Sequence, residues 1–245
     1  MLIGTASVAD LAVRAPTIEH FTGETIRFDG VELLQLTAEM KNAARVAVLP
    51  PALHPTVPAT LSVQVLNIRE SPWGPFSFAV CRVGCRSGVR ARGFTTRAYA
   101  TTAVAADAMA STFGYPCGVA EVSLRRGYDG ADARVETDRT VLFSGGGIDP
   151  IPMGADDVQY TGSPNLASTP RGLRLVQVES EHHPQQVERL TPRIGVFAGE
   201  HWGNPLLVPS YVVSASIAVE SLEYPPVRFV CRPEELAFTG TESVR

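Results

Sequence analysis

Among the side chains able to do chemistry, the histidines are the first candidates. His182 and His183 are adjacent, in a stretch that also holds Glu179, Glu181 and Pro184. A metal site needs three or four ligands that converge on one point, whereas adjacent residues on a strand point to opposite faces. The sequence therefore favours a polar hairpin or strand end at this place, and we expect no bound metal.

The four cysteines offer thiols but no motif. Cys81 and Cys85 are separated by three residues in a strand-like stretch, which places them roughly 13 Å apart, too far for a disulfide. Neither Cys117 nor Cys231 forms a CxxC pair or has a neighbouring histidine, so zinc ligation is not indicated. We expect reduced thiols in a cytoplasmic protein.

Amine chemistry depends on one residue. Lys41 is the single lysine among the 21 lysine and arginine residues, a bias that GC-rich codon usage alone can produce. It lies in a Lys-Asn-Ala-Ala-Arg stretch typical of an exposed helix face. An exposed lysine has a pKa near about 10.4, is almost wholly protonated at neutral pH and attacks ketones poorly. A catalytic role for Lys41 is therefore not favoured.

Two further motifs are absent. Residues 144–148 read Ser-Gly-Gly-Gly-Ile, which does not match GxGxxG, and the Asp-Pro-Ile-Pro stretch that follows prevents a helix. A phosphate-binding loop needs a helix N-terminus at that point, so this segment is expected to be a turn between strands. The chain also has no GxSxG elbow for a serine nucleophile.

Length and charge exclude several classes of protein. The chain has 245 residues, 44% of them hydrophobic, and a net charge of −4, so we expect one domain spanning residues 1–245 that binds neither nucleic acid nor an anionic membrane. No apolar run approaches the roughly 18 residues of a membrane span. The first sixteen residues include Asp10 and Arg14, unlike a signal peptide.

The elements that must position these residues are mostly strands. Glycine and proline, 21 and 19 residues, divide the chain into short apolar or alternating runs of strand length. These runs are Leu33–Leu36, Leu61–Ile68, Phe76–Val83, Thr140–Phe143, Leu173–Val178, Ile194–Phe197, Tyr211–Val219 and Val227–Val230. Short helices are predicted over residues 38–48 and 104–113, the second ended by Gly114. Residues 145–168 are expected to form a long loop. The pattern predicts an α+β fold, mainly antiparallel β and barrel-like, with few helices.

Four short segments resemble those of a known family. Residues 113–118 (Phe-Gly-Tyr-Pro-Cys-Gly) follow a predicted helix, as an aromatic-Pro-Lys-Lys segment does in the acetoacetate decarboxylase family. Residues 48–53 (Val-Leu-Pro-Pro-Ala-Leu) are similar to the family's Val-Pro-x-Pro-Leu element. Residues 71–76 (Ser-Pro-Trp-Gly-Pro-Phe) resemble its Gly-x-Tyr turn, and residues 187–194 resemble its Gly-Pro-x-Arg strand entry. Their order and spacing match the family over roughly residues 25–230.

The resemblance implies a cone-shaped β-barrel with a central, apolar-walled cavity, commonly assembled into homo-oligomers. In that family a lysine forms a Schiff base with a β-keto acid, and the iminium accepts the electrons as CO2 leaves. The matching positions here hold Cys117 and Gly118 instead of two lysines, and Gln64 and Phe78 instead of two acidic residues. These departures remove charge from the reacting centre and predict against Schiff-base decarboxylation.

The remaining residues define a candidate site. Tyr115 is a candidate general acid toward a carbonyl oxygen, Gln64 a neutral hydrogen-bonding group, and Cys117 either a nucleophile or, as favoured, a small cavity-wall residue. The candidate substrate-binding residues are Arg69, Glu70, Trp73, Phe76, Phe78, Phe113 and Gly118. The aromatic residues among them are equally compatible with ordinary barrel core. We expect no cofactor.

Three functions fit these residues. The favoured one is an acetoacetate-decarboxylase-like enzyme that acts on a hydrophobic carbonyl compound, β-keto or polyketide-like, by non-covalent acid/base chemistry. Its reaction would be of lyase, hydratase, dehydratase or cyclase type, within secondary metabolism. The alternative is a non-catalytic member of the same fold that binds a small molecule. The third is decarboxylation of a β-keto acid by another route, for which the sequence offers no electron sink.

Overall fold

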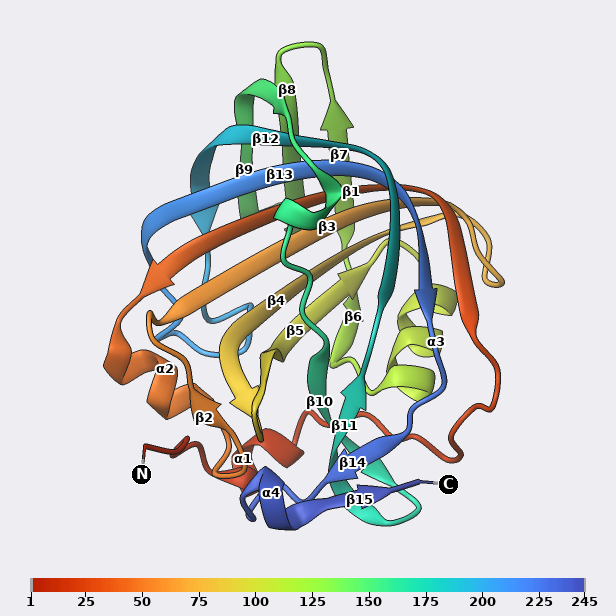
Figure 1. Cartoon of the computed structure of the whole chain (residues 1–245), viewed down its shortest axis with the longest axis vertical. Coiled ribbons are helices and arrows are strands. Elements are labelled where there is room, and N and C mark those ends of the chain that lie inside the picture. Colours follow the sequence, from red (N-terminus) through yellow and green to blue (C-terminus); the bar gives the residue numbers. More distant parts are fainter. Residues whose placement is uncertain (1, 245) are drawn as a thin grey trace.

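The computed structural model describes residues 2–244 and is dominated by one large, strongly bent sheet (Figure 1). Its eleven strands are β1 (Ile26–Met40), β2 (His54–Pro55), β3 (Thr60–Glu70), β4 (Phe76–Ser87), β5 (Arg90–Ala100), β6 (Cys117–Val119), β7 (Glu121–Arg126), β8 (Gly130–Thr137), β9 (Thr140–Pro152), β12 (Glu181–Phe197) and β13 (Pro209–Tyr224). Their order is β6-β5-β4-β3-β1-β13-β12-β9-β8-β7, with β2 paired to β4. Only the β5–β6 pair among these is parallel.

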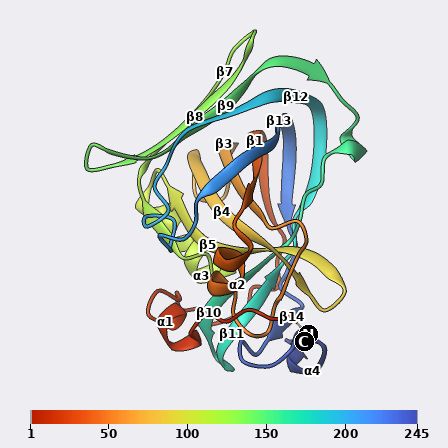
Figure 2. The ribbon, with the colours of Figure 1, turned by 90° about the vertical axis from the view of Figure 1, so that its left-hand side faces the viewer.

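The sheet closes almost into a barrel. β7 lies at one end of the strand order, yet it contacts β3, β4 and β5 near the other end. Figure 2 shows the β7–β9 layer arching over β3 and β4. The predicted fold, mainly antiparallel β in a barrel-like arrangement with few short helices, is confirmed.

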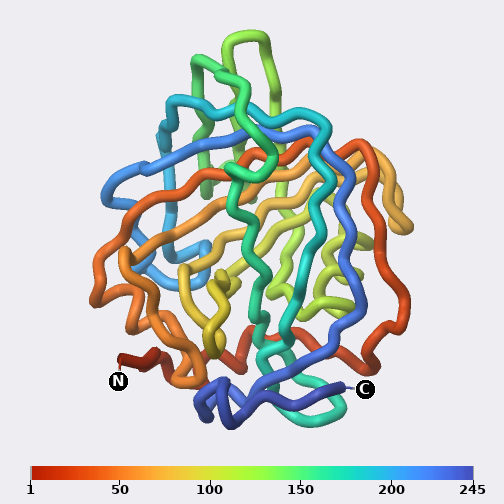
Figure 3. Tube along the Cα trace, viewed as in Figure 1, coloured from red at the N-terminus to blue at the C-terminus, as the bar shows by residue number. Residues whose placement is uncertain are grey.

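A smaller sheet and short helices complete the molecule. The small sheet has the order β10 (Ser163–Thr169), β11 (Gly172–Val178), β14 (Phe229–Cys231) and β15 (Thr241–Ser243). The helices are α1 (Val8–Ala12), α2 (Asn42–Val48), α3 (Ala103–Phe113), the 3-10 turn η1 (Ala155–Asp157) and α4 (Ala237–Gly240). The Cα trace shows both chain ends near this small sheet (Figure 3). No helix within residues 2–244 is long and apolar enough to cross a membrane.

Alternation along the central strands divides the buried residues into two cores. Leu34 and Leu36 of β1 belong to the core enclosed by the barrel, together with Val63, Val65, Leu142, Phe143 and Trp202. Leu33 belongs to the other core, which α3 and the small sheet cover, together with Leu66, Phe78, Tyr115, Val176 and Leu222. We call the face of β1, β3, β4 and β13 that carries this second core the graded face, because its side chains change from apolar to polar along the strands.

The two predicted helices have different outcomes. The helix at residues 104–113 is confirmed as α3: Thr102 caps its N-terminus, and Gly114 ends it with a left-handed φ of 71°. The helix predicted from residue 38 is wrong over its first part, because β1 continues to Met40 and α2 begins only at Asn42. Ala38 pairs with Leu61 and with Val212, so strand pairing on both sides outweighs local helix propensity.

The long loop predicted at residues 145–168 is also wrong over most of its length. β9 extends to Pro152 and β10 begins at Ser163. The glycines lie inside β9 rather than in a turn, and a Cβ at Gly146 would overlap the carbonyl oxygen of Ala131 on β8. Their function is close backbone approach.

Residues 153–162 do form an extended connection, which we call the strap. At one end the amide of Met153 donates to the carbonyl of Val187 at 3.0 Å. At the other end the amide of Gly93 donates to the carbonyl of Gly162 at 3.2 Å. In Figure 1 the strap runs between β9 and β10 in front of the central strands, so it covers part of the graded face.

Candidate active site

A chain of polar side chains crosses the graded face. Gln64 donates through Nε2 to Oε1 of Gln35 at 2.6 Å, and its own Oε1 accepts a hydrogen bond from Nη1 of Arg82. Arg82 Nη2 donates to the phenol oxygen of Tyr115 at 3.2 Å. The Tyr115 oxygen lies 3.3 Å from Oγ of Ser163 on the small sheet. The two catalytic candidates Gln64 and Tyr115 are therefore linked through Arg82.

Strand register and a helix end place these groups together. Gln35 lies directly opposite Gln64, so their side chains share a face. Arg82 lies opposite Ser62, two residues along β3 from Gln64, and so on that same face. Tyr115 follows the glycine that ends α3 and is fully buried. Its ring meets that of Phe78 edge-on, with centroids 5.4 Å apart.

Arg82 is a buried cation without a counter-ion. Its residue is only 6% exposed, and it forms no ion pair with any carboxylate of residues 2–244. Its Nε also has no hydrogen-bond partner within that range. A buried charge is costly unless it is compensated, and a buried guanidinium stabilises negative charge that develops on a nearby oxygen. Arg82 thus makes the Tyr115 hydroxyl a stronger hydrogen-bond donor toward such an oxygen.

A second polar group lies on the same face of β13. His182 donates through Nδ1 to Oε1 of the buried Glu220 at 2.8 Å, and Ser180 Oγ lies 3.1 Å from its Nε2. The ring of Tyr160, from the strap, stacks on the His182 imidazole with centroids 3.6 Å apart. Oε2 of Glu220 and the Tyr160 hydroxyl are buried without partners among the described residues. Burial, together with the Glu220 carboxylate, raises the pKa of Tyr160.

Tyr224 connects the two groups electrostatically. Burial raises the pKa of Tyr224 well above its ordinary value, and Tyr115 and Glu220 raise it further, whereas Arg82 acts in the opposite direction. The ring of Tyr224 packs between those of Phe28 and Phe113. One buried face holds an unpaired carboxylate oxygen, the phenols of Tyr115 and Tyr224 and an uncompensated cation, which are the components of an acid–base site.

A cavity of about 460 Å³ adjoins this network at the polar end of the graded face. Gln35 belongs to both the network and the cavity, since it accepts a hydrogen bond from Gln64 and also lines the cavity. Its own amide donates to the strap carbonyl of Gln159 at 3.3 Å. The lining is rich in Ser and Thr hydroxyls, with Arg92, Arg189 and Asp157. Apolar side chains, among them Val57, Met153 and Val158, line the cavity as well, so the wall is mixed.

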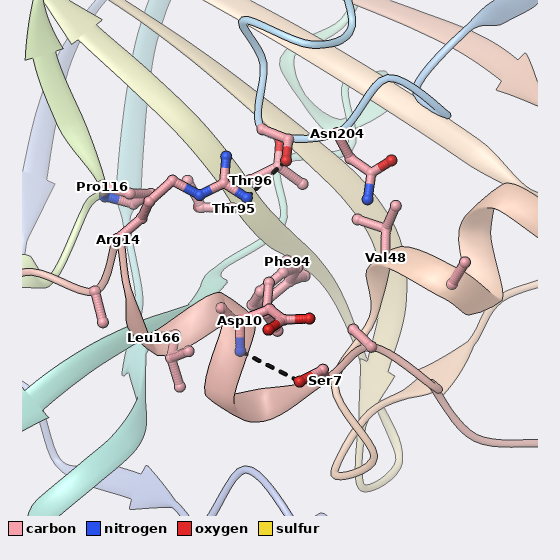
Figure 4. A pocket seen from close by; sticks show the side chains of 15 residues that line it. Ser7, Asp10, Arg14, Val48, Phe94, Thr95, Thr96, Pro116, Leu166 and Asn204 are labelled. Carbon is pink, nitrogen blue, oxygen red and sulfur yellow. Dashed lines mark hydrogen bonds between the residues drawn. The ribbon is translucent and has the colours of Figure 1, made fainter.

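A smaller cavity of about 140 Å³ lies between α1, α2 and β5 (Figure 4). Its charged lining residues are Asp10 and Arg14, and Arg14 is engaged by the carbonyl of Gly203 at 2.7 Å. None of the Gln64, Arg82 and Tyr115 side chains lines either cavity, but Gln35, which accepts a hydrogen bond from Gln64, lines the larger one. We therefore place the candidate site at the larger cavity.

The other candidate residues occupy different places. Phe113 packs on Tyr224, with ring centroids 4.9 Å apart, and so lies beside the network. Trp73 and Phe76 pack against Phe28 at the apolar end of the graded face. Arg69, with a side chain 73% exposed, has an ion pair with Glu32. Glu70 is exposed as well.

The positions that match the family's lysines do not join the network. Cys117 and Gly118 lie in β6 and pair with Ala98 and Tyr99. Burial raises the pKa of the Cys117 thiol to about 12. A Cβ at Gly118 would meet the Arg97 guanidinium. The arrangement gives no activating base for a thiolate nucleophile.

Residues 181–183 form the predicted strand end, since β12 begins at Glu181. Glu181, His183 and Glu223 bring ligand atoms within 4.8 Å of one another on the exposed side, where Arg27 donates to Glu223 at 3.3 Å. The expectation that adjacent histidines diverge is confirmed, because His182 turns inward to Glu220.

Sequence reasoning missed Arg82, Glu220 and Tyr160. Arg82 did carry a signal, because it is a charged residue inside the otherwise apolar run Phe76–Val83. Glu220 follows the predicted strand Tyr211–Val219 by one residue, so the strand was ended too early. Tyr160 lay in the segment that was expected to be a loop.

No family model matches this chain. No curated protein matches its sequence. Solved structures do match its fold, and they include acetoacetate decarboxylases and an acetoacetate-decarboxylase-like enzyme.

The acetoacetate decarboxylase of Legionella pneumophila aligns with a TM-score of 0.73 at 15% identity, over 86% of this chain and 88% of that one. The enduracididine biosynthesis enzyme MppR, complexed with the condensation product of pyruvate and imidazole 4-carboxaldehyde, aligns with a TM-score of 0.68 at 14% identity, over 83% and 88% of the two chains. An acetoacetate-decarboxylase-like enzyme from Sphingomonas wittichii RW1 has a TM-score of 0.67 at 14% identity, over 86% and 98%. The chain therefore has the acetoacetate-decarboxylase-like fold.

Proposed function

We propose that this protein is an acid–base enzyme of the acetoacetate-decarboxylase-like fold that acts on a small carbonyl compound without a Schiff base. The observation that carries the proposal is the buried hydrogen bond between Arg82 and Tyr115, in which a cation without a counter-ion is directed at a phenol. An amine route is disfavoured because the only lysine, Lys41, is exposed where α2 begins. MppR, which shares the fold, has been solved with pyruvate.

The network supports proton abstraction next to a carbonyl. The substrate oxygen accepts a hydrogen bond from Tyr115, and Arg82 stabilises the negative charge that forms on that oxygen. The free Oε2 of Glu220 takes the proton from the adjacent carbon, and His182 positions the carboxylate through its Oε1. The product of this step is an enol or enolate, the common intermediate of lyase, dehydratase and cyclase reactions.

Access requires one side chain to move. Tyr115 is fully buried, and Gln35 stands between the cavity and Gln64. Gln35 is half-buried, and a substrate carbonyl that displaces it would meet the donors of Gln64 and Arg82. This closed arrangement also favours the second candidate function, a non-catalytic binding protein, since no catalytic group is open to the cavity in this conformation.

Proton exchange in D2O separates these functions. Pyruvate and acetoacetate are incubated with the protein, and loss of the proton signal beside the carbonyl is followed by NMR. We expect exchange above the buffer rate, and no borohydride-trapped adduct on Lys41. Saturable binding of these probes without exchange would instead support the binding protein, and a trapped adduct would overturn the non-covalent mechanism.

We also propose homo-oligomeric assembly, which the family resemblance implied. Light scattering of the purified chain tests it.

A further inference from the structure

The cavity wall is built from two cross-strand rows of polar residues. In the first row, Ser216 of β13 lies opposite Gln35 of β1, which lies opposite Gln64 of β3. In the second row, Ser214 lies opposite Thr37, which lies opposite Ser62. Directly opposed residues share a sheet face, so both rows point to the same side.

The hydroxyl groups in this wall are not used by the protein. Thr37, Thr60, Ser62, Thr161, Ser214 and Ser216 all line the cavity, and no side-chain hydrogen bond of theirs occurs within the described part of the chain. Five of these side chains are half-buried and Ser214 is exposed, so their hydroxyls are open to solvent and to a ligand. Six free hydroxyls around one cavity of about 460 Å³ are therefore available to the molecule that fills it.

Gly84 leaves room for the hydroxyl of Thr60 and for that of Thr56, which donates to the carbonyl of Pro58 at 3.4 Å. A Cβ at position 84 would lie 2.9 Å from Oγ1 of Thr56 and would overlap Oγ1 of Thr60. Any larger residue would push these threonines out of position. The backbone at β4 thus leaves room for hydroxyl groups rather than for an apolar wall.

The charges at the cavity are mainly positive. Arg189 on β12 lines it, lies opposite Ser216 and has no ion pair among residues 2–244. Arg92 lines it too and pairs with Glu179. Asp157 of the strap is the one carboxylate in the lining. A guanidinium without a carboxylate partner binds an acidic group on a ligand.

We propose that the cavity binds a polyhydroxylated carbonyl compound of the keto-sugar-acid class. The ligand's hydroxyl groups pair with the two polar rows, its carboxylate meets Arg189, and its carbonyl end lies toward Gln35 and the Arg82–Tyr115 pair. The inference rests on the proposed function for the orientation of the carbonyl, but the hydroxyl wall supports the ligand class by itself. A cavity of this volume is within the range of small-molecule sites.

Calorimetry with two matched probes tests the ligand class. 2-Keto-D-gluconate carries the hydroxyls, and 2-oxohexanoate has the same 2-keto acid group and six carbons without them. The variants Thr37→Val and Ser216→Ala each remove one hydroxyl from the wall. Ser123→Ala is the matched control, since Ser123 lines a separate surface hollow on the β7–β9 layer. Thermal melting confirms that each variant is folded.

We expect 2-keto-D-gluconate to bind at least tenfold more tightly than 2-oxohexanoate, and each wall variant to weaken it fivefold or more while the control does not. Equal or tighter binding of 2-oxohexanoate, no binding of either probe, or wall variants that leave the affinity unchanged would overturn the ligand class. Comparison of this titration with the proton-exchange assay separates the two proposals. Hydroxyl-dependent binding without proton exchange in the wild type contradicts only the proposed reaction, and exchange without the hydroxyl preference contradicts only the ligand class.

Discussion

The guanidinium of Arg82 donates a hydrogen bond to the phenol oxygen of Tyr115 at 3.2 Å, and both side chains are buried. The second amino group of the same guanidinium holds Gln64. The two residues come from β4 and from the segment after α3, which only the folded chain brings together. The pair places a positive charge next to a phenol hydroxyl, and Gln64 and Gln35 separate it from the cavity.

Replacing Arg82 by methionine should separate stability from activity. Removal of a buried charge that lacks a counter-ion relieves its desolvation cost, which offsets the lost hydrogen bonds to Gln64 and Tyr115. We expect the free energy of unfolding to change by less than about 1.5 kcal/mol, while proton exchange falls about 100-fold or more. Urea unfolding and the NMR exchange assay measure the two effects. Unchanged exchange in a folded Arg82→Met protein would remove Arg82 from the mechanism.

Two substitutions at Glu220 distinguish a base from a structural acceptor. Glu220→Gln keeps an oxygen that accepts from His182 but cannot take a proton, so we expect a folded protein with exchange reduced about 100-fold. Glu220→Ala leaves Nδ1 of His182 buried without a partner and should cost about 1–3 kcal/mol of stability. Full activity in the glutamine variant would show that Glu220 only holds His182 in place.

The thiol of Cys117 should be unreactive near neutral pH. Burial raises its pKa to about 12, so at pH 8 only about one molecule in 10⁴ carries the thiolate. Alkylation by iodoacetamide should be far slower than that of glutathione and should rise about tenfold per pH unit up to pH 11, as long as the protein stays folded. Mass spectrometry of the Cys117 peptide follows the reaction. Cys117→Ser should retain proton exchange, and its loss would restore the thiol as a nucleophile candidate.

The glycines of β9 should be required for folding. An alanine methyl at Gly146 would overlap the backbone oxygen of Ala131, and backbone cannot move aside as a flexible side chain does. We expect Gly146→Ala to destabilise the protein by about 2–3 kcal/mol. Gly23→Ala is the control, because nothing lies within 4 Å of a Cβ at Gly23. Equal melting temperatures for the two variants would contradict this role.

Local patterns predicted those parts of the fold that depend on neighbours in sequence. The helix at residues 103–113 was recognised because its stop signal, Gly114, is local and adopts the left-handed backbone that glycine favours. The strand β1 was predicted only over Leu33–Leu36, although it spans Ile26–Met40. Its remaining length depends on pairing with β3 and β13, a long-range interaction that no local signal records.

The site was predictable only in part, for a related reason. Tyr115, Gln64 and Phe78 were named through the family resemblance, and the structure places them around Arg82. The polar half of β1, β3 and β13 has the alternation of an ordinary solvent-facing strand, so its position at a cavity depends on how the strap and β12 lie beside it. No sequence motif indicates Glu220, because its partner, His182, lies 38 residues away on a neighbouring strand.

The most direct measurement of the central claim compares Tyr115→Phe with Tyr99→Phe. Both changes remove one hydroxyl. Tyr99, however, belongs to the core enclosed by the barrel, where its hydroxyl donates to the carbonyl of His201. Proton exchange on a 2-keto acid that the wild type processes is followed by NMR in D2O for both folded variants. We predict that Tyr115→Phe lowers the exchange rate by about 100- to 10,000-fold and that Tyr99→Phe leaves it within about threefold of wild type. Exchange at the wild-type rate in Tyr115→Phe would contradict the account.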